Sequence, residues 1–159
     1  MNGPEEVLGV KIVGGLREAS TPWAGVCLLV EMYRRSGVDA VANKMLPAKK
    51  STKGLKQGQT VESFVLLSAL GGECVDDMQH LRTDAGLQGI LGYQPPAPET
   101  ARQWLDGFHD EGLMMGQPLQ GSFLPPEPKP LVGLKEVRRR TIRAYVEAVH
   151  PGWDVTLDI

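Results

Sequence analysis

Residues 58–93 read GQTVESFVLLSALGGECVDDMQHLRTDAGLQGILGY, and this stretch decides the fold. Its first part is an apolar run made up of Val61, Phe64, Val65, Leu66, Leu67, Ala69 and Leu70. A helix of this composition has almost no polar face, so we expect it to be the core helix, surrounded by protein. We expect Thr60 to cap its start, with Glu62 in the positive first turn. Gly71-Gly72 should end it, because glycine adopts the left-handed conformation of a helix stop.

Two shorter helices should follow this core helix. Apolar residues recur at three- and four-residue spacing, as Val75, Met78 and Leu81 and then as Leu87, Ile90 and Leu91. This spacing is typical of one face of a helix. Thr83 and Asp84 supply a cap between the two segments, and Gly92 closes the second. The stretch therefore predicts an irregular cluster of three helices.

The flanking sequence extends this helical pattern. Pro22, after Ser20 and Thr21, and Pro98 both suit the first turn of a helix, and each precedes an apolar stripe. A further helix is expected over 134–149. Short strands are expected within 8–13 and from Trp153 onward, where apolar and polar residues alternate. The predicted fold is mainly α, an orthogonal multi-helix cluster with a short N-terminal strand and a C-terminal strand.

Composition limits the class of protein. With 159 residues, 42% of them hydrophobic, the chain can bury one core. The first residues carry Glu5 and Glu6, and no apolar run approaches a membrane span, so we expect a cytoplasmic protein without a membrane partner. Cys27 and Cys74 fall within apolar helical patterns and are expected to be small buried residues. No Ser-His-Asp or Cys-His set is assembled, and no small-molecule substrate is expected.

Basic residues are concentrated in two segments although the net charge is -2. The segment 42–58 has no acidic residue and contains Lys44, Lys49, Lys50, Lys53 and Lys56. We call 48–56 the lysine arm; composition alone favours an ordinary solvated loop, and the alternative is contact with DNA phosphates. In the 134–149 helix we expect the pairs Glu136–Arg140 and Arg143–Glu147, which leave Arg138 and Arg139 free for DNA.

The helix that begins at Pro98 carries side chains that could read DNA bases. Its apolar stripe of Ala101, Trp104, Leu105 and Phe108 leaves Arg102 and Gln103 facing outward, and both side chains suit the major groove. Together with the helix before it, the segment has a loose helix-turn-helix outline, with a connection longer than in the standard motif. The alternative, which weighs more, is a surface helix of mixed charge packed on the core.

A family resemblance covers much of the chain. The segment 60–93, then PPAPETARQWLDGFHDE at 95–111, GSFLPPE at 121–127 and VTLDI at 155–159 resemble, in this order, the N-terminal half of bacterial insertion-sequence transposases of the DDE class. Members of that family carry a helical, DNA-associated region before an RNase H-like catalytic domain. The resemblance implies a DNA-associated region over 1–111, a Pro/Gly-rich connector over 112–133, and over 134–159 a helix with the first strand of a truncated RNase H-like sheet.

The resemblance also implies function. It places Asp158 next to the first metal-binding acid of the family, which makes Asp158 at best a secondary metal ligand. Two Mg²⁺ ions held by several carboxylates would cut and join DNA in the full-length enzyme, so we expect this fragment to bind no metal and to be inactive alone. Expected partners are double-stranded transposon ends and a second copy in a homodimer. The alternative is a stand-alone remnant that binds DNA or protein without catalysis. Asp76 and Asp77 are expected to serve as helix caps.

Overall fold

The computed structural model describes residues 6–7, 10–11, 19–47, 54–109, 111–114, 127–149 and Gly152. The chain is mainly helical, as the sequence predicts. Its helices are α1 Val26–Arg35, α2 Val38–Met45, α3 Gln57–Ala69, the 3-10 turn η1 Val75–Asp77, α4 Met78–Thr83, α5 Ala85–Leu91, α6 Pro98–Asp106, α7 Glu111–Met114 and α8 Lys129–Val149. Two short strands, β1 Glu6–Val7 and β2 Val10–Lys11, pair antiparallel. The strand expected from Trp153 and most of the stretch 8–13 lie outside the described residues.

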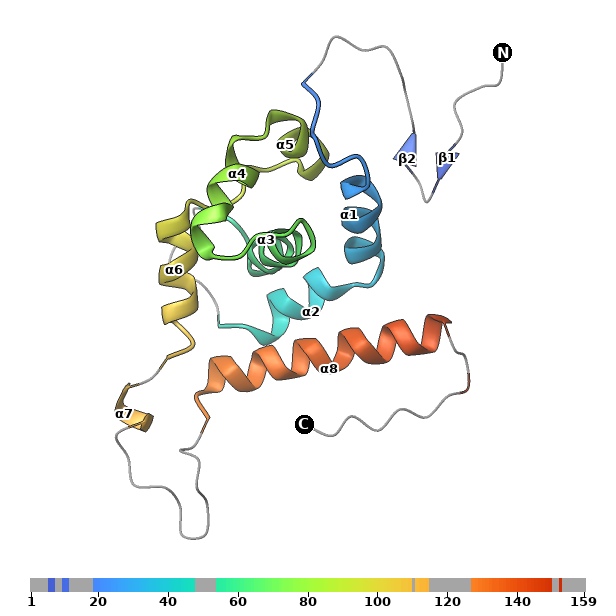
Figure 1. Ribbon diagram of the computed structural model, residues 1–159. Coiled ribbons are helices and arrows are strands. Elements are labelled where there is room, and N and C mark those ends of the chain that lie inside the picture. Colours follow the sequence, from blue (N-terminus) through green and yellow to red (C-terminus); the bar gives the residue numbers. More distant parts are fainter. Residues whose placement is uncertain are drawn as a thin grey trace, which may run out of the picture.

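Helix α3 is the centre of the fold. Figure 1 shows it end-on, with α1, α2, α4, α5 and α6 arranged around it. It begins at Gln57, so the prediction that Thr60 caps it is wrong. Gln59 supplies the capping contact, because its side-chain oxygen accepts a hydrogen bond from the Lys56 backbone N–H at 2.8 Å. Thr60 lies inside the first turn, where its hydroxyl donates to the Lys56 carbonyl at 3.2 Å.

The two glycines end α3 as predicted. Gly71 has a φ of 84°, in the left-handed region, and the Gly72 N–H donates to the Leu67 carbonyl at 2.8 Å. This bond satisfies one of the carbonyls that the end of a helix leaves without an intrahelical partner. The stop turns the chain back over α3 toward η1 and α4.

The tight turn makes Gly72 a sensitive position. A Cβ atom added there would lie 2.4 Å from Leu67 Cδ1 and 2.9 Å from the Leu67 carbonyl oxygen. We therefore expect Gly72→Ala to lower the free energy of unfolding by about 1 to 3 kcal/mol, as overpacked sites do. The matched control is Gly89→Ala in α5, where a Cβ meets nothing within 4 Å, and where we expect a gain of up to about 1 kcal/mol from helix propensity. Urea unfolding of both variants checks this; equal effects would contradict the close approach of Gly72 to Leu67.

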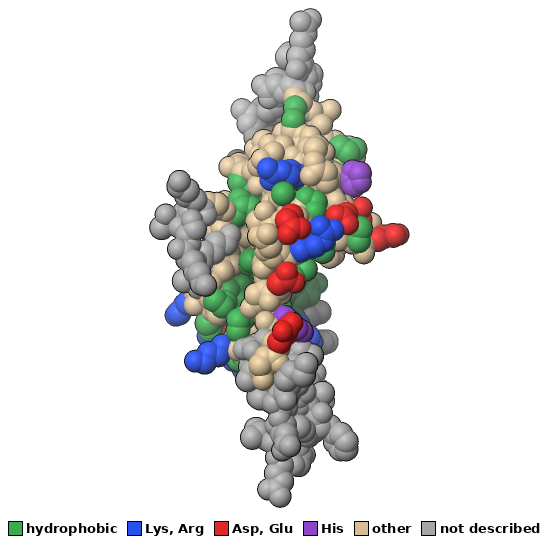
Figure 2. Space-filling view, turned by 90° about the vertical axis from the view of Figure 1, so that its left-hand side faces the viewer, with side chains coloured by type: hydrophobic (Ala, Val, Ile, Leu, Met, Phe, Trp, Pro, Cys, Tyr) green, Lys and Arg blue, Asp and Glu red, His purple; other side chains and the backbone are tan. Residues whose placement is uncertain are grey.

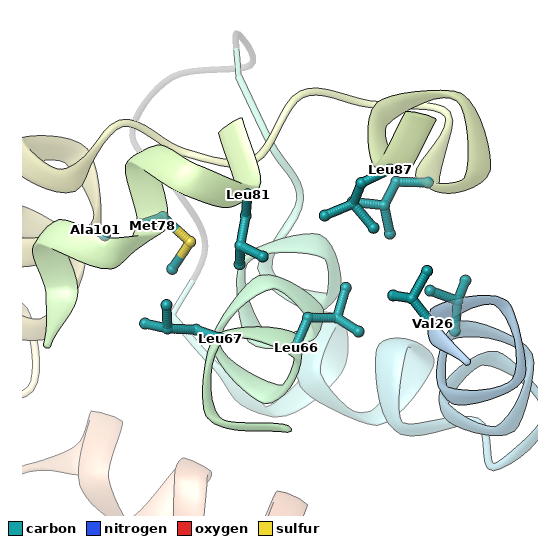
Figure 3. Close-up of a cluster of buried hydrophobic side chains, with 9 residues drawn as sticks. Val26, Leu66, Leu67, Met78, Leu81, Leu87 and Ala101 are labelled. Atoms are coloured by element: carbon teal, nitrogen blue, oxygen red, sulfur yellow. The ribbon is translucent and has the colours of Figure 1, made fainter. Parts of the chain in front are cut away.

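The main hydrophobic core lies above α3 (Figure 3). Leu66 and Leu67 point into it from α3, and Met78, Leu81 and Leu87 cover them from α4 and α5. All five side chains are buried. Each contributes about 1.5 to 3 kcal/mol relative to an exposed side chain. These contacts fix the three helices of the 58–93 stretch against one another.

A second cluster joins α2, α3 and α8. Val137 of α8 is buried among residues that include Ala42 of α2 and Val61 of α3. α8 begins at Lys129, five residues earlier than the sequence predicts, because a proline such as Pro130 fits the first turn of a helix. At Gly133 the backbone of α8 comes so close to α2 that an added Cβ would lie 2.5 Å from the Met45 carbonyl oxygen. The basic helix is therefore packed on the helical body.

Several residues that were expected to be buried are not. The clearest cases are Val65, Ala69, Cys74 and Leu105, all of which are exposed. α3 is thus not enclosed on every side, since neighbouring helices leave the strip around Val65 and Ala69 open. Cys74 is exposed because it lies in an extended backbone conformation before η1, outside any apolar helix face.

Candidate nucleic-acid interface

The lysine arm joins α2 to α3, and most of it lies outside the described residues. The three lysines in that part are Lys49, Lys50 and Lys53. Lys56 is described and is exposed at the residue before α3. The Gln57 side-chain nitrogen donates to the Pro47 carbonyl at 2.5 Å. The two residues that flank the arm, Pro47 and Gln57, therefore lie next to each other just after the end of α2.

α8 carries the second basic segment. Six basic and three acidic residues occur between Glu127 and Glu147. Lys135 forms an ion pair with Glu127. Arg138 and Arg143 are exposed, and neither has an ion-pair or hydrogen-bond partner among the residues that the structure describes, so the predicted Arg143–Glu147 pair is not formed there. Because both side chains are exposed on α8, these two guanidinium groups are accessible to a ligand.

Arg139 is not the free side chain that the sequence predicts. Glu136 accepts hydrogen bonds from Arg139 Nε at 2.8 Å and from Arg140 Nε at 2.6 Å. The two bonds, first that from Arg139, lower the pKa of Glu136 to about 2. The same contact raises the pKa of Arg139. The predicted Glu136–Arg140 pair is confirmed, and the prediction for Arg139 is wrong because one carboxylate spans both the i+3 and the i+4 position.

α6 presents Arg102 and Gln103 to solvent, as predicted, but both side chains donate hydrogen bonds to carboxylates. Arg102 donates a hydrogen bond to Asp76 and lies 3.8 Å from Glu99. The bond to Asp76 is the main cause that raises the pKa of Arg102. The Gln103 side chain donates to Glu99 at 3.2 Å. Figure 2 shows the side of the molecule on which α6 lies, with acidic side chains along it and basic ones among them. This mixed charge matches the alternative of a surface helix packed on the core.

The helix-turn-helix outline is not formed by α5 and α6. α6 packs mainly on η1 and α4, whereas α5 packs mainly on α1 and α4 (Figure 1). The cause is the segment 92–97, in which Pro95 and Pro96 are buried. Arg82 holds this segment by donating to the Pro95 carbonyl at 2.6 Å. The connection carries α6 past α4 and away from α5.

The carboxylates named as metal or capping candidates are partly described. Asp158, the secondary metal-ligand candidate, lies outside the described residues. Asp76 pairs with Arg102. Asp77 accepts backbone hydrogen bonds from Glu73 at 2.9 Å and Cys74 at 3.1 Å, which lower its pKa. Across the described part of the chain, no group of three or more His, Cys, Asp or Glu side chains could hold a metal ion. The expectation of Mg²⁺ in a longer enzyme stays a prediction.

A buried polar network at α3 was missed by the sequence analysis. Glu62, 3% exposed, accepts from Arg34 Nε at 3.0 Å and lies 2.9 Å from the Tyr93 hydroxyl. Arg34 also donates to the Leu91 carbonyl at 2.7 Å. The network links α1, α3 and the end of α5. A single carboxylate within an apolar run was the available signal, because a buried charge needs partners.

Two tyrosines, Tyr93 in this network and Tyr33 near it, give the protein a predictable pH dependence. Burial is the main cause that raises the pKa of both Tyr33 and Tyr93 above the ordinary value of 10.0. Above about pH 10 the unfolded chain therefore binds fewer protons than the folded chain, so stability is complete below that pH and is lost as the pH rises. We expect Tyr93→Phe to make this loss shallower by up to about 1.4 kcal/mol per pH unit. Urea unfolding between about pH 9 and pH 11 measures the slopes. Equal slopes for wild type and variant would contradict the burial of Tyr93.

No protein-family model, curated protein or solved structure matches the chain. Among its described residues, none of the helices combines the length and the apolar character needed to cross a bilayer. The transposase resemblance is therefore an expectation from sequence patterns alone, and a DNA-binding role must be argued from charge and geometry.

Proposed function

We propose that this chain binds duplex DNA through α8 and the lysine arm, as the DNA-positioning N-terminal part of a DDE transposase. The observation that carries the DNA contact is the exposure of Arg138 and Arg143 on a 21-residue helix, without acidic partners among the described residues. The assignment to a transposase rests on the resemblance of 60–111, 121–127 and 155–159. Binding of DNA alone, without catalysis, is common to this proposal and to the stand-alone alternative.

The packing of α8 supports a joint surface with the lysine arm. α2 ends at Met45, just before the arm, and its Met45 carbonyl lies against Gly133 of α8. The first half of α8 therefore lies beside the point where the arm leaves α2. A basic segment that leaves α2 at this point and the exposed arginines of α8 would both suit contacts with phosphates, which supply affinity and a steep salt dependence without reading sequence.

Base readout by α6 is a separate prediction. Arg102 and Gln103 would have to exchange their contacts with Asp76 and Glu99 for contacts with bases. Binding of Arg102→Ala and Gln103→Ala to terminal inverted repeats and to random duplexes tests it. A loss confined to the inverted repeats supports readout by α6, and an equal loss on both duplexes, or none, contradicts it.

We propose binding and positioning of DNA for α8 and the lysine arm, and no catalytic step for the residues that the structure describes. Asp76 and Asp77 already have structural partners, and Asp84 caps α5 by accepting from the Leu87 N–H at 2.9 Å. The resemblance places the catalytic acid after Asp158, where Mg²⁺ would stabilise the attacking and leaving oxygens of DNA. A second copy that forms a homodimer belongs to the same proposal.

The test removes the two unpaired arginines of α8. We expect Arg138→Gln/Arg143→Gln to weaken binding to a duplex of any sequence and to reduce the salt slope of log K by about 2, one for each phosphate contact. The control Arg35→Gln/Arg82→Gln removes the same charge from α1 and α4, and neither residue belongs to the surface proposed for DNA. Fluorescence anisotropy at several salt concentrations measures both, with thermal melts to verify folding. Equal slopes for the two double variants would contradict the role of α8.

A further inference from the structure

A groove lies beside α4, on the other side of α3 from α8. It consists of two adjoining hollows, one of about 310 Å³ and one of about 480 Å³. Both are lined by Trp23, which precedes α1, and by His80 of α4. The two hollows therefore adjoin at these side chains, and we call them together the groove. None of the residues that line it belongs to the surface proposed above for DNA.

The first hollow has an apolar floor. Leu67 and Leu70 of α3 and Leu81 of α4 line it, together with the Trp23 ring. Trp23 is partly buried and packs against the main hydrophobic core, which holds its ring in place. A rigid indole beside aliphatic side chains can cover the methylene stem of a long side chain.

The carboxylates of Glu73 and Asp77 line the same hollow. Glu73 is exposed, and its carboxylate has no partner among the described residues. Asp77 uses Oδ2 for the backbone N–H groups of Glu73 and Cys74, whereas the sole partner of Oδ1 among the described residues is His80 Nε2, at 3.9 Å. In the second hollow, both oxygens of Asp84 are occupied, by the Leu87 N–H and the Thr21 hydroxyl. The accepting capacity of the groove is therefore concentrated at Glu73 and Asp77.

We infer that this groove binds a lysine or arginine side chain of a basic protein segment. A cation placed over the face of Trp23 is attracted by the ring, and its aliphatic stem lies on the leucine floor. Glu73 and Oδ1 of Asp77 accept the hydrogen bonds of its charged head. The same carboxylates repel the phosphates of a nucleic acid. The protein therefore has two surfaces of opposite charge preference, a basic one at α8 and this acidic, aromatic one beside α4.

The first test uses two small probes that differ in charge and have the same shape. N-acetyl-arginine amide and N-acetyl-citrulline amide are titrated into the full chain at constant ionic strength, and the Trp23 indole N–H signal, assigned with Trp23→Phe, is followed by NMR. We expect a saturable shift with the arginine probe and none with the citrulline probe. Equal shifts would overturn the inference. A shift with thymidine monophosphate at lower concentrations than with arginine would also overturn it, in favour of a nucleotide.

The second test removes the free carboxylate. Glu73→Gln is expected to weaken binding of the arginine probe by about twofold to fivefold, the effect of one exposed ion pair. Glu147→Gln is the matched control, because Glu147 is also exposed and without a partner among the described residues, but lies on α8. Neither change removes a described contact, so both variants should fold. Equal affinity of the two variants for the probe would overturn the inference and would leave the DNA proposal untouched.

Discussion

Replacing Glu62 with alanine is expected to lower the free energy of unfolding by about 2 to 4 kcal/mol, measured by urea unfolding near pH 7. Glu62 is 3% exposed and accepts from Arg34 at 3.0 Å, with the Tyr93 hydroxyl at 2.9 Å. The variant removes the carboxylate that pairs with Arg34 and leaves the Arg34 guanidinium and the Tyr93 hydroxyl without this hydrogen-bond acceptor. The Arg34 side chain is 41% exposed, so water can solvate part of its charge in the variant. The expected loss of unfolding free energy is therefore smaller than for a fully buried ion pair.

The double variant Arg34→Met/Glu62→Leu is the control for this prediction. Replacing a buried ion pair with apolar side chains of similar size leaves no unpaired charge, so we expect it to be more stable than Glu62→Ala. A loss below about 0.5 kcal/mol for Glu62→Ala, the range of a surface substitution, would mean that the network is not formed in solution.

Leu66→Ala is expected to cost about 2 to 5 kcal/mol, the range for a leucine removed from a packed core. Leu66 is 2% exposed and lies where α3 faces Leu87 and Val26 (Figure 3). Few neighbouring atoms can move to fill the space, because α1, α4 and α5 all pack on the same cluster. Urea unfolding measures the loss.

Val65, the residue before Leu66, gives a matched control. Val65 is 42% exposed, so Val65→Ala should cost less than about 1 kcal/mol. The two positions are adjacent in an apolar run whose pattern does not distinguish them. Equal losses would contradict the orientation of α3.

The sequence predicted those features that depend on local chemistry. Gly71 and Gly72 end α3, Asp84 caps α5, and Pro98 opens α6, because in each case the residue type and its immediate neighbours determine the backbone conformation. The start of α3 was misplaced at Thr60, since the side chain of Gln59 performs the capping role there. Capping by a longer side chain gives a weaker sequence pattern.

Features that depend on distant segments could not be predicted. Glu62 meets Arg34 and Tyr93 across about 30 residues of chain in each direction, and nothing in the local pattern indicates which partner a buried carboxylate finds. The packing of α8 on α2 depends on the contact between Gly133 and Met45. The separation of α5 from α6 depends on Arg82 and the buried prolines.

The candidate site divides in the same way. Exposure of Arg138 followed from its place in the helical period. The pairing of Arg139 was missed because Glu136 was assigned to Arg140 alone, whereas its second carboxylate oxygen also reaches Arg139 at the i+3 position. Outward placement of Arg102 was predicted, and its partner Asp76, 26 residues away, was not. Local periodicity indicates which side chains face outward and which can pair within one helix, whereas contacts between helices depend on the tertiary fold.

Binding of the wild-type chain to a random-sequence duplex as a function of salt tests the central claim most directly. If α8 and the lysine arm contact phosphates, log K falls linearly with log salt, with a slope of about -2 to -5, since each neutralised phosphate contributes about 0.9. Fluorescence anisotropy with a labelled duplex measures the slope. Absence of binding at low salt, or binding with a slope near zero, would contradict the claim that this helical body positions DNA.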